Sequence, residues 1–138
     1  ANSTSLAQPT VIGLTPGRAT LYNQEYGTQA DGEYLPAYIQ TAEFAIGDGN
    51  DSMFIRRYIP DFKNQQGGVQ MEFLVRQYPG STQQVASSTV VYSTTTKVDM
   101  RARGRQVAIK MTSVDGQDSS TTFRFGTLRI DAQPDGLR

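Results

Sequence analysis

The run Lys97–Met111 restricts the fold of this chain more than any other stretch. Apolar and polar side chains alternate over Val98–Met100 and again over Val107–Met111, on either side of Arg103-Gly104. A period of two residues is typical of a β-strand with one buried and one solvent-exposed face. We interpret the run as a β-hairpin, because two alternating segments joined by a short Gly-containing turn are its usual signature.

The turn of such a hairpin sets which side chains meet on each face. A two-residue loop, or a four-residue loop with the same register, pairs Met100 with Val107 and Val98 with Ile109, which keeps the apolar face continuous. We therefore expect an even-numbered loop. The outer face then carries charged side chains, and Asp99 lies diagonally within reach of Lys110. This set is Lys97, Asp99, Arg101, Arg103 and Lys110.

The strictest alternation lies in Gly67–Tyr78, which predicts a strand with one face formed by Val69, Met71, Phe73 and Val75. Ser52–Ile59 predicts another strand, with Met53, Ile55 and Ile59 on one side, and large groups on its other side indicate that both faces are covered. Thr121–Asp131 predicts the last strand, with Phe123 and Phe125 inward, before Gln133–Gly136 ends the fold.

Three other segments have less regular patterns. Pro36–Ile46 predicts a strand with Tyr38, Ala42, Phe44 and Ile46 inward. The Ser-, Thr- and Gln-rich segment Ser81–Thr89 predicts a solvated loop, and Val90–Tyr92 a short strand after it.

The strand pattern as a whole predicts an all-β protein. No helical period persists for ten residues, and seven to nine short strands with turns between them favour an antiparallel β-sandwich, jelly-roll or immunoglobulin-like. A closed barrel is the alternative. We expect residues 1–10 to be a flexible arm or linker and residues 11–138 to form a single domain. The absence of Met at position 1 indicates processing or a piece of a longer protein.

Composition argues against most enzyme mechanisms. The chain has no Cys and no His, which removes disulfides, zinc–thiolate sites and the usual general base. Positive and negative charges balance at 13 each, so no overall field attracts nucleic acid. No apolar run approaches ~20 residues, so we expect no transmembrane helix or membrane anchor. We expect a protein without cofactor, metal or catalytic residues. A carboxylate pair drawn from Glu43, Glu72 and Asp99 is the remaining enzymatic alternative.

Eight segments together resemble the C-terminal region of the tail nozzle or hub (phage stabilisation-type) virion proteins of short-tailed phages and prophages. Each motif is weak alone, and the resemblance rests on their order and spacing over roughly residues 20–138. The segments are Leu21–Tyr26, Ala37–Ile39, Phe44–Gly49, Met53–Lys63, Val75–Pro79, Thr95–Arg105, Phe125–Arg129 and Asp131–Gly136.

The resemblance implies a structural role in a phage virion, in the tail or neck. It implies a symmetric homo-oligomeric ring that also contacts other virion proteins, and we expect the ring to pack through sheet edges and charged rims. In this family a longer N-terminal portion, thought to be propeller-like, precedes such a region. A capsid cement or decoration protein is one alternative, and a carbohydrate- or receptor-binding β-sandwich module is another.

Two groups of arginines are candidates for contact with a partner. Arg101, Arg103 and Arg105 would form a basic rim, suited to a neighbouring subunit or to passing genomic DNA; a solvated hairpin tip is the plainer interpretation. Arg56 and Arg57 stand near Asp61, where we expect an ion pair within the chain, with a subunit interface as the alternative.

An acidic segment is the expected counterpart of the basic rim. Because a ring needs two different patches on each subunit, we pair Arg101–Arg105 with the loop Glu43–Asp51, which contains Asp48. Asp48, Asn50 and Asp51 form a turn rather than a cation site, since the further acidic ligands of a calcium loop are missing, and Asp115 and Asp118 are interpreted in the same way.

Tyrosines form the last candidate group. Tyr38 is expected at a subunit interface, where tyrosine is enriched. A carbohydrate-binding surface is the alternative use of this residue together with Tyr22, Tyr26, Tyr34 and Tyr92.

Overall fold

The computed structural model describes residues 12–14, 17, 21–23, 29–30, 33–114 and 121–137. They contain thirteen strands and no helix. The strands are β1 (Ile12–Leu14), β2 (Leu21–Asn23), β3 (Gln29–Ala30), β4 (Glu33–Tyr34), β5 (Tyr38–Gln40), β6 (Asp51–Ile59), β7 (Phe62–Gln66), β8 (Val69–Arg76), β9 (Gln84–Val91), β10 (Val98–Gly104), β11 (Gln106–Ser113), β12 (Thr122–Phe125) and β13 (Arg129–Leu137). In this part of the chain nothing helical is long and apolar enough to span a membrane.

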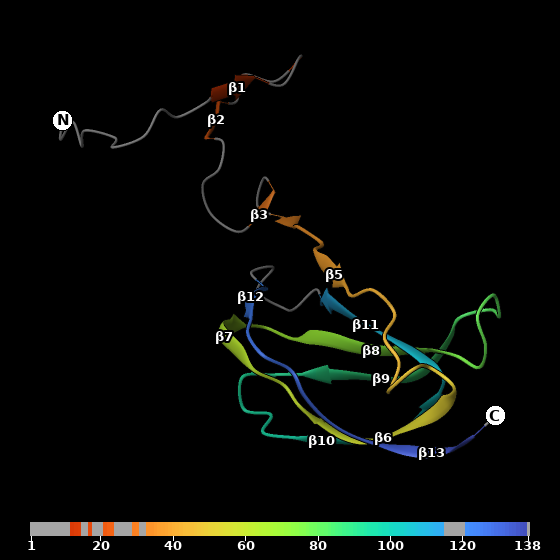
Figure 1. The fold of residues 1–138 in the computed structure, drawn as a ribbon. Helices are drawn as coiled ribbons and strands as arrows, with labels where there is room; N and C mark the ends of the chain where they lie inside the picture. Colours follow the sequence, from red (N-terminus) through yellow and green to blue (C-terminus); the bar gives the residue numbers. More distant parts are fainter. Residues whose placement is uncertain are drawn as a thin grey trace.

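Two antiparallel sheets form the body of the molecule. One has the strand order β5-β11-β8-β9 and the other β10-β6-β13, and they face each other as two layers (Figure 1). The pairs β1–β2, β3–β4 and β7–β12 make three smaller sheets. No sheet of the described residues closes into a barrel, so the predicted antiparallel β-sandwich is confirmed.

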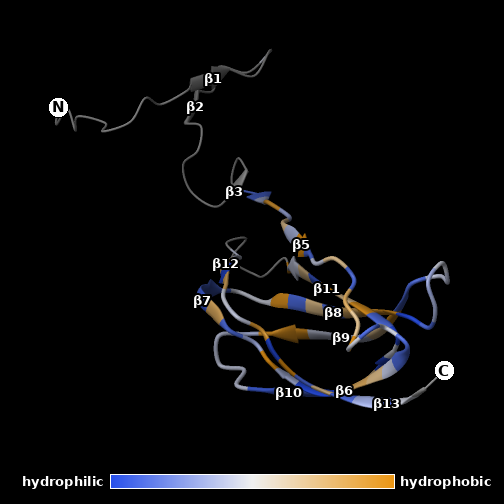
Figure 2. Ribbon diagram, viewed as in Figure 1, coloured by the Kyte–Doolittle hydropathy of each residue, from blue (hydrophilic) through white to orange (hydrophobic). Residues whose placement is uncertain are grey.

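The core lies between the two main sheets. Strand β8 supplies Val69, Met71, Phe73 and Val75, all buried, while the residues between them are half-buried, as its alternation predicts. The same alternation is visible as orange and blue segments along the strand in Figure 2. β6 contributes from the opposite layer, where the ring of Tyr58 packs on Phe73 with centroids 4.9 Å apart.

Strands β10 and β11 do not form the predicted hairpin. β10 pairs with β6 and β11 with β8, so the chain crosses from one sheet to the other at Arg105. Met100 and Val107 are both buried, but in opposite layers of the core instead of side by side. Alternation requires only that one face of each strand be buried, and a corner between two sheets satisfies this as well as a hairpin does.

The charged face of this run also differs from the prediction. Asp99 lies 3.5 Å from the Arg57 guanidinium of β6, and the Lys110 ammonium lies over the Tyr38 ring, 5.2 Å from its centroid. The predicted contact between Asp99 and Lys110 is wrong, because the two residues belong to different sheets.

A register shift in β6 explains a second difference. Met53 and Ile55 face the core as predicted, but the pairing with both neighbours shifts between Ile55 and Arg57. Beyond the shift Tyr58 is buried and Ile59 is 38% exposed, so Ile59 does not share the inner face. Arg56 and Arg57 are both exposed at the shift, and the prediction that both faces of this strand are covered is wrong.

The less regular segments were predicted least well. Ser81–Thr89 is not a loop, because most of it lies in the edge strand β9. Pro36–Ile46 forms only the three residues of β5 and an isolated bridge from Phe44 to Val107. Tyr38, Ala42 and Phe44 are exposed, and Ile46 alone of the predicted inward set packs on the core.

The C-terminal segment is also organised differently. The predicted last strand divides into β12 and β13, and β13 continues through Pro134 to Leu137 instead of ending before it. Phe123 packs against the core, whereas Phe125 is 39% exposed. Both rings lie against Phe62 of β7, with centroids 5.5 and 5.9 Å away.

Candidate interaction surfaces

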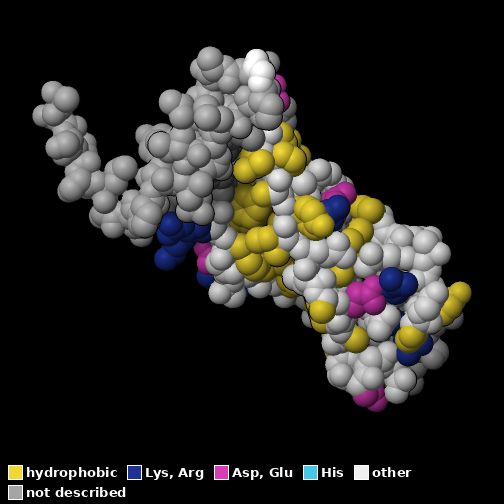
Figure 3. All heavy atoms as spheres, turned by 90° about the horizontal axis from the view of Figure 1, so that it is seen from above, with side chains coloured by type: hydrophobic (Ala, Val, Ile, Leu, Met, Phe, Trp, Pro, Cys, Tyr) yellow, Lys and Arg dark blue, Asp and Glu magenta, His cyan; other side chains and the backbone are white. Residues whose placement is uncertain are grey.

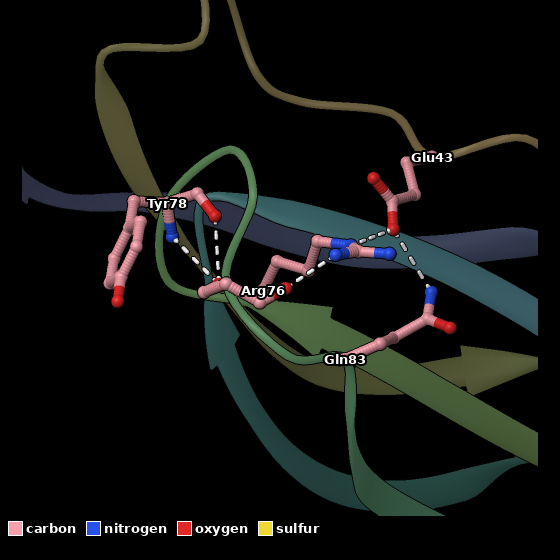
Figure 4. A network of polar contacts seen from close by, with 5 residues as sticks. Glu43, Arg76, Tyr78 and Gln83 are labelled. Carbon is pink, nitrogen blue, oxygen red and sulfur yellow. Dashed lines mark hydrogen bonds and ion pairs between the residues drawn. The ribbon is translucent and has the colours of Figure 1, made fainter.

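A polar network crosses the outer face of the four-stranded sheet at one end. Glu43 follows β5, and its carboxylate Oε1 accepts hydrogen bonds from Arg76 of β8 and from Gln83 Nε2 at 3.0 Å (Figure 4). Because β11 lies between β5 and β8, the Glu43 side chain spans a strand to reach them. Arg76 also donates to the Ser81 carbonyl, which ties the β8–β9 turn to the same network.

This network changes the role expected for Glu43. Its carboxylate is partly buried and paired with Arg76 of the same chain, so this side chain holds the segment after β5 against the sheet. Arg76 and Gln83 were not singled out in the sequence, and no local pattern identifies them, because the partner of Arg76 is 33 positions away.

The three arginines of the predicted rim lie in different environments. Arg101 and Arg103 are exposed on β10, where Arg103 Nε lies 2.6 Å from the Asp135 carboxylate of β13. Arg105 sits at the corner between the sheets, and its Nε and Nη2 both donate to the Gly49 carbonyl at 3.1 and 2.9 Å. Arg101 has no ion pair within the described residues.

Arg105 therefore contacts the predicted partner loop of the rim, but within one chain. The loop itself is a turn, in which Asp48 accepts hydrogen bonds from the Asn50 backbone and side-chain nitrogens at 3.2 and 3.1 Å. Asp51 begins β6. The described residues hold no group of three acidic, His or Cys side chains arranged to bind a metal ion. Asp115 and Asp118 lie outside these residues.

Arg56 and Arg57 form ion pairs with neighbouring strands of their own sheet. Arg56 Nη2 lies 2.9 Å from Asp131 of β13, and Arg57 pairs with Asp99 of β10. Neither uses Asp61, the partner expected from the sequence. All four side chains are well exposed, so each pair contributes at most about 1 kcal/mol and serves mainly to match strand register.

The tyrosines do not form one surface. Tyr38 is 68% exposed on β5 and Tyr92 is 54% exposed just after β9, at opposite edges of the four-stranded sheet. The Tyr34 hydroxyl instead bonds to Ser113, at its Oγ 2.7 Å away and at its carbonyl. Tyr26 and the Tyr22 side chain lie outside the described residues.

One groove of about 310 Å³ opens beside β5. Its polar groups are largely used inside the chain: Ser113 Oγ accepts from the Ala37 backbone N–H at 2.9 Å, and Thr121 Oγ1 donates to the Val114 carbonyl at 2.6 Å. A site with few free polar groups offers little chemistry. The lining residues are Leu35, Ala37, Ile39, Ser113, Thr121, Thr122 and Phe123.

A single buried tyrosine has a perturbed ionisation. The Tyr58 side chain is 1% exposed and its hydroxyl has no hydrogen-bond partner in the described part of the chain. Burial raises the pKa of Tyr58 to about 12, and the nearby Thr89 hydroxyl, which acts on it without forming a well-aligned hydrogen bond, lowers it by less. A phenol that stays neutral in the core cannot act as a base at ordinary pH.

The chain matches no model of a known protein family, and it matches no curated protein.

Proposed function

We propose that this chain is a non-enzymatic structural component of a bacteriophage virion, in the tail nozzle, hub or neck. In this role it packs with copies of itself in a ring and contacts other virion proteins. The sequence resemblance to short-tailed phage nozzle and hub proteins supports the location.

One structural observation carries the assembly part of the proposal. Polar side chains such as Glu43, Arg76 and Arg105 mostly bridge segments of the same chain, whereas ten large hydrophobic side chains of the described residues are at least 37% exposed. Apolar side chains that a folded chain leaves in solvent are the groups that assembly buries most favourably. A module whose polar side chains mostly pair with one another, and whose apolar side chains are often exposed, is therefore better suited to packing than to catalysis.

Native mass spectrometry of the purified chain and of virions that contain it tests this function. We expect a closed ring of defined order from the chain and its presence in the particle. A chain that stays monomeric at high concentration and is absent from virions would contradict the proposal. Presence in the head but not in the tail would favour a cement protein instead.

The basic rim gives a second prediction within this function. Arg101→Glu should raise the dissociation constant for ring assembly by about 1.4- to fivefold, since exposed charge pairs contribute about 0.2–1 kcal/mol each. Arg101 is preferred to Arg103 because reversal at Arg103 also breaks its pair with Asp135. Arg124→Glu, on the exposed face of β12, is the control. An unchanged dissociation constant and salt dependence for Arg101→Glu would remove the rim from the interface.

The carbohydrate-binding alternative has a separate readout. Titrating host glycans while recording tyrosine fluorescence should give no saturable change for a packing module. A saturable change that is lost in Tyr38→Ala would favour the binding module.

A further inference from the structure

The exposed apolar residues are concentrated at two opposite edges of one sheet. Among the residues that the structure describes, ten large hydrophobic side chains are exposed, of which four lie in Leu35–Phe44, which contains β5, and four in Tyr78–Tyr92, which contains β9. We call these segments the β5 edge and the β9 edge. Seen from above, hydrophobic side chains run in a broken band across this side of the molecule (Figure 3). The eight residues are Leu35, Tyr38, Ile39, Phe44, Tyr78, Val85, Val90 and Tyr92.

Both edges have few of the charges that usually protect a sheet edge: Glu43, which pairs with Arg76, is the one charged residue in the β5 edge, and the β9 edge has none. No charged residue occurs from Tyr34 to Ala42 or from Gln77 to Thr96. Natural proteins block pairing at free strands with lysines, prolines or very short strands. The other sheet follows this rule, since β10 exposes Arg101 and Arg103 and β13 contains Pro134. β9 has eight residues and an uncharged free side, with a register shift opposite Phe73 and Leu74, whereas β5 is only three residues long.

The backbone of β9 is open to a further strand. It pairs only with β8, and in an antiparallel ladder every second residue directs its N–H and C=O away from the paired neighbour. Within the described residues no backbone hydrogen bond reaches Gln84–Val91 from that side. Gln65 Nε2 covers one end of the strand by donating to the Val91 carbonyl at 2.8 Å.

Strand directions allow the two edges to meet in a ring. Each neighbouring pair in the order β5-β11-β8-β9 is antiparallel, so β5 and β9 run in opposite directions. Rotation about an axis roughly parallel to the strands keeps those directions, and β9 of one copy then meets β5 of the next as an antiparallel pair. The contact joins two different patches, as ring closure requires.

We propose that the β9 edge of one copy pairs with the β5 edge of the next, which extends the four-stranded sheet from subunit to subunit. This inference rests on the self-assembly in the proposed function and names the surface and partner that produce it. The inference does not rest on the basic rim, because Arg103 pairs with Asp135 and Arg105 donates to Gly49 of the loop Glu43–Asp51 within the same chain.

The register within the sheet indicates which residues meet. Tyr38 is opposite Thr112, Thr112 is opposite Gln70, and Gln70 is opposite Val90, so Tyr38 and Val90 end the same row. If the next copy continues that row, Val90 lies beside Tyr38 of its neighbour. A pair of aromatic and β-branched side chains on one face is a favourable cross-strand contact.

Cysteine cross-linking tests the pairing directly, because the chain has no cysteine of its own. Tyr38→Cys and Val90→Cys variants are prepared separately, mixed under assembling conditions and treated with a short bismaleimide, which tolerates a small shift in register. We expect covalent dimers from the mixture and only traces from either variant alone. Efficient cross-linking of Val90→Cys with itself would instead show a twofold contact and overturn the proposal.

A charged substitution in the β9 edge tests the proposed pairing independently of cross-linking. Val90→Lys should weaken assembly by at least about tenfold, because an unpaired charge would be enclosed at every seam of the ring. Ile59→Lys is the matched control, since Val90 and Ile59 are 37% and 38% exposed and Ile59 lies in neither edge. Equal loss of assembly for both variants, with thermal unfolding unchanged, would contradict an edge-specific contact.

The outcomes separate this inference from the proposed function. A chain that remains monomeric contradicts the self-assembly itself. A ring that forms without Tyr38–Val90 cross-links and is unaffected by Val90→Lys overturns only the edge pairing. In a third outcome, Val90→Lys weakens assembly, no copies of the chain cross-link to each other, and Val90→Cys captures a different virion protein. This result would assign the edge to that protein and would also overturn the pairing of copies.

Discussion

At the scale of single residues, Tyr58 combines close packing with an unsatisfied group. Its ring is fully enclosed against Phe73, yet its hydroxyl has no hydrogen-bond partner among the described residues. A buried polar atom without a partner costs about 1–3 kcal/mol. The aromatic contact offsets this, because buried ring pairs contribute beyond the area they enclose.

Tyr58→Phe should therefore stabilise the protein, by about 1 kcal/mol at neutral pH. The substitution keeps the ring and removes the hydroxyl. Urea unfolding at pH 7 measures the change, and Tyr78→Phe, on an exposed ring, is the control that should leave stability unaltered. A destabilised Tyr58→Phe variant would show that the hydroxyl does have a partner in solution.

The same residue predicts a loss of stability at high pH. Its pKa of about 12 in the folded protein lies above the unfolded value of 10.0, so the folded state holds the proton more tightly. The contribution of this raised pKa to the free energy of unfolding is fully present below pH 10. It is lost as pH rises towards 12, at about 1.4 kcal/mol per pH unit. The difference in unfolding free energy between wild type and Tyr58→Phe, measured from pH 8 to 11.5, isolates this term. A constant difference would refute it.

At the scale of elements, the corner between β10 and β11 depends on Gly104. A Cβ atom at this position would lie 2.9 Å from Val75 Cβ and 3.1 Å from the Arg76 carbonyl oxygen. Neither group moves without shifting β8, so the close approach of the two layers at the corner requires a residue without a side chain.

Gly104→Ala should destabilise the protein by about 1–3 kcal/mol, the usual range for overpacking a core. Gly68→Ala is an informative comparison, because its Cβ would meet Val90 Cγ1 at 2.8 Å, a methyl group on an exposed side chain that can rotate away. Chemical denaturation of both variants should give the larger loss for Gly104→Ala. The reverse order would mean that the corner is more adaptable than the edge.

The elements also show what sequence patterns determine. The alternation of Val69–Val75 was sufficient to predict β8, because burial of every second residue is a local requirement. The alternation at Met100 and Val107 identified two strands but not their partners, since strand pairing depends on distant segments such as β6 and β8. Only the end of β9, Val90 and Val91, falls in the predicted strand Val90–Tyr92. The rest was missed because the Ser and Thr residues that favour loops also fit an edge strand with one solvated side.

The candidate sites were harder to predict than the strands. Arg56, Arg57 and Arg103 are paired with Asp131, Asp99 and Asp135, each on a neighbouring or more distant strand, and no local spacing reveals such partners. The uncharged run Gln77–Thr96 was present in the sequence as a signal of an unprotected edge. It has that meaning only once β9 is known to be the last strand of its sheet.

At the scale of the whole molecule, apolar edges and charged rims respond differently to salt. The screening length falls from about 10 Å at 0.1 M to about 3 Å at 1 M ionic strength, which weakens contacts between exposed charges. Burial of apolar side chains is not screened, and sulfate strengthens it. If the two sheet edges provide most of the contact, the ring should persist in 1 M NaCl and become tighter in ammonium sulfate.

Sedimentation velocity at increasing salt checks this expectation on the intact chain. Val90→Lys and Arg101→Glu should be measured in parallel. Sulfate should no longer strengthen assembly of Val90→Lys, whose edge carries a charge, but should still strengthen assembly of Arg101→Glu. Dissociation of the wild-type ring in 1 M NaCl would assign the interface to the charged rims and not to the edges.

The position of β13 has a consequence for the order in which the molecule is made. β6 is the middle strand of its sheet, and one of its two neighbours comes from the last residues described, where Ala132 pairs with Ile55 and Leu137 with Asp51. Because both of its neighbours follow it in the chain, β6 stays unpaired during synthesis until β10 has emerged from the ribosome, and one side stays open until β13 has emerged. Contacts between such distant segments slow folding to milliseconds or seconds. The nascent chain thus depends on β13 to complete this sheet, and the proposed assembly into a ring would follow that step.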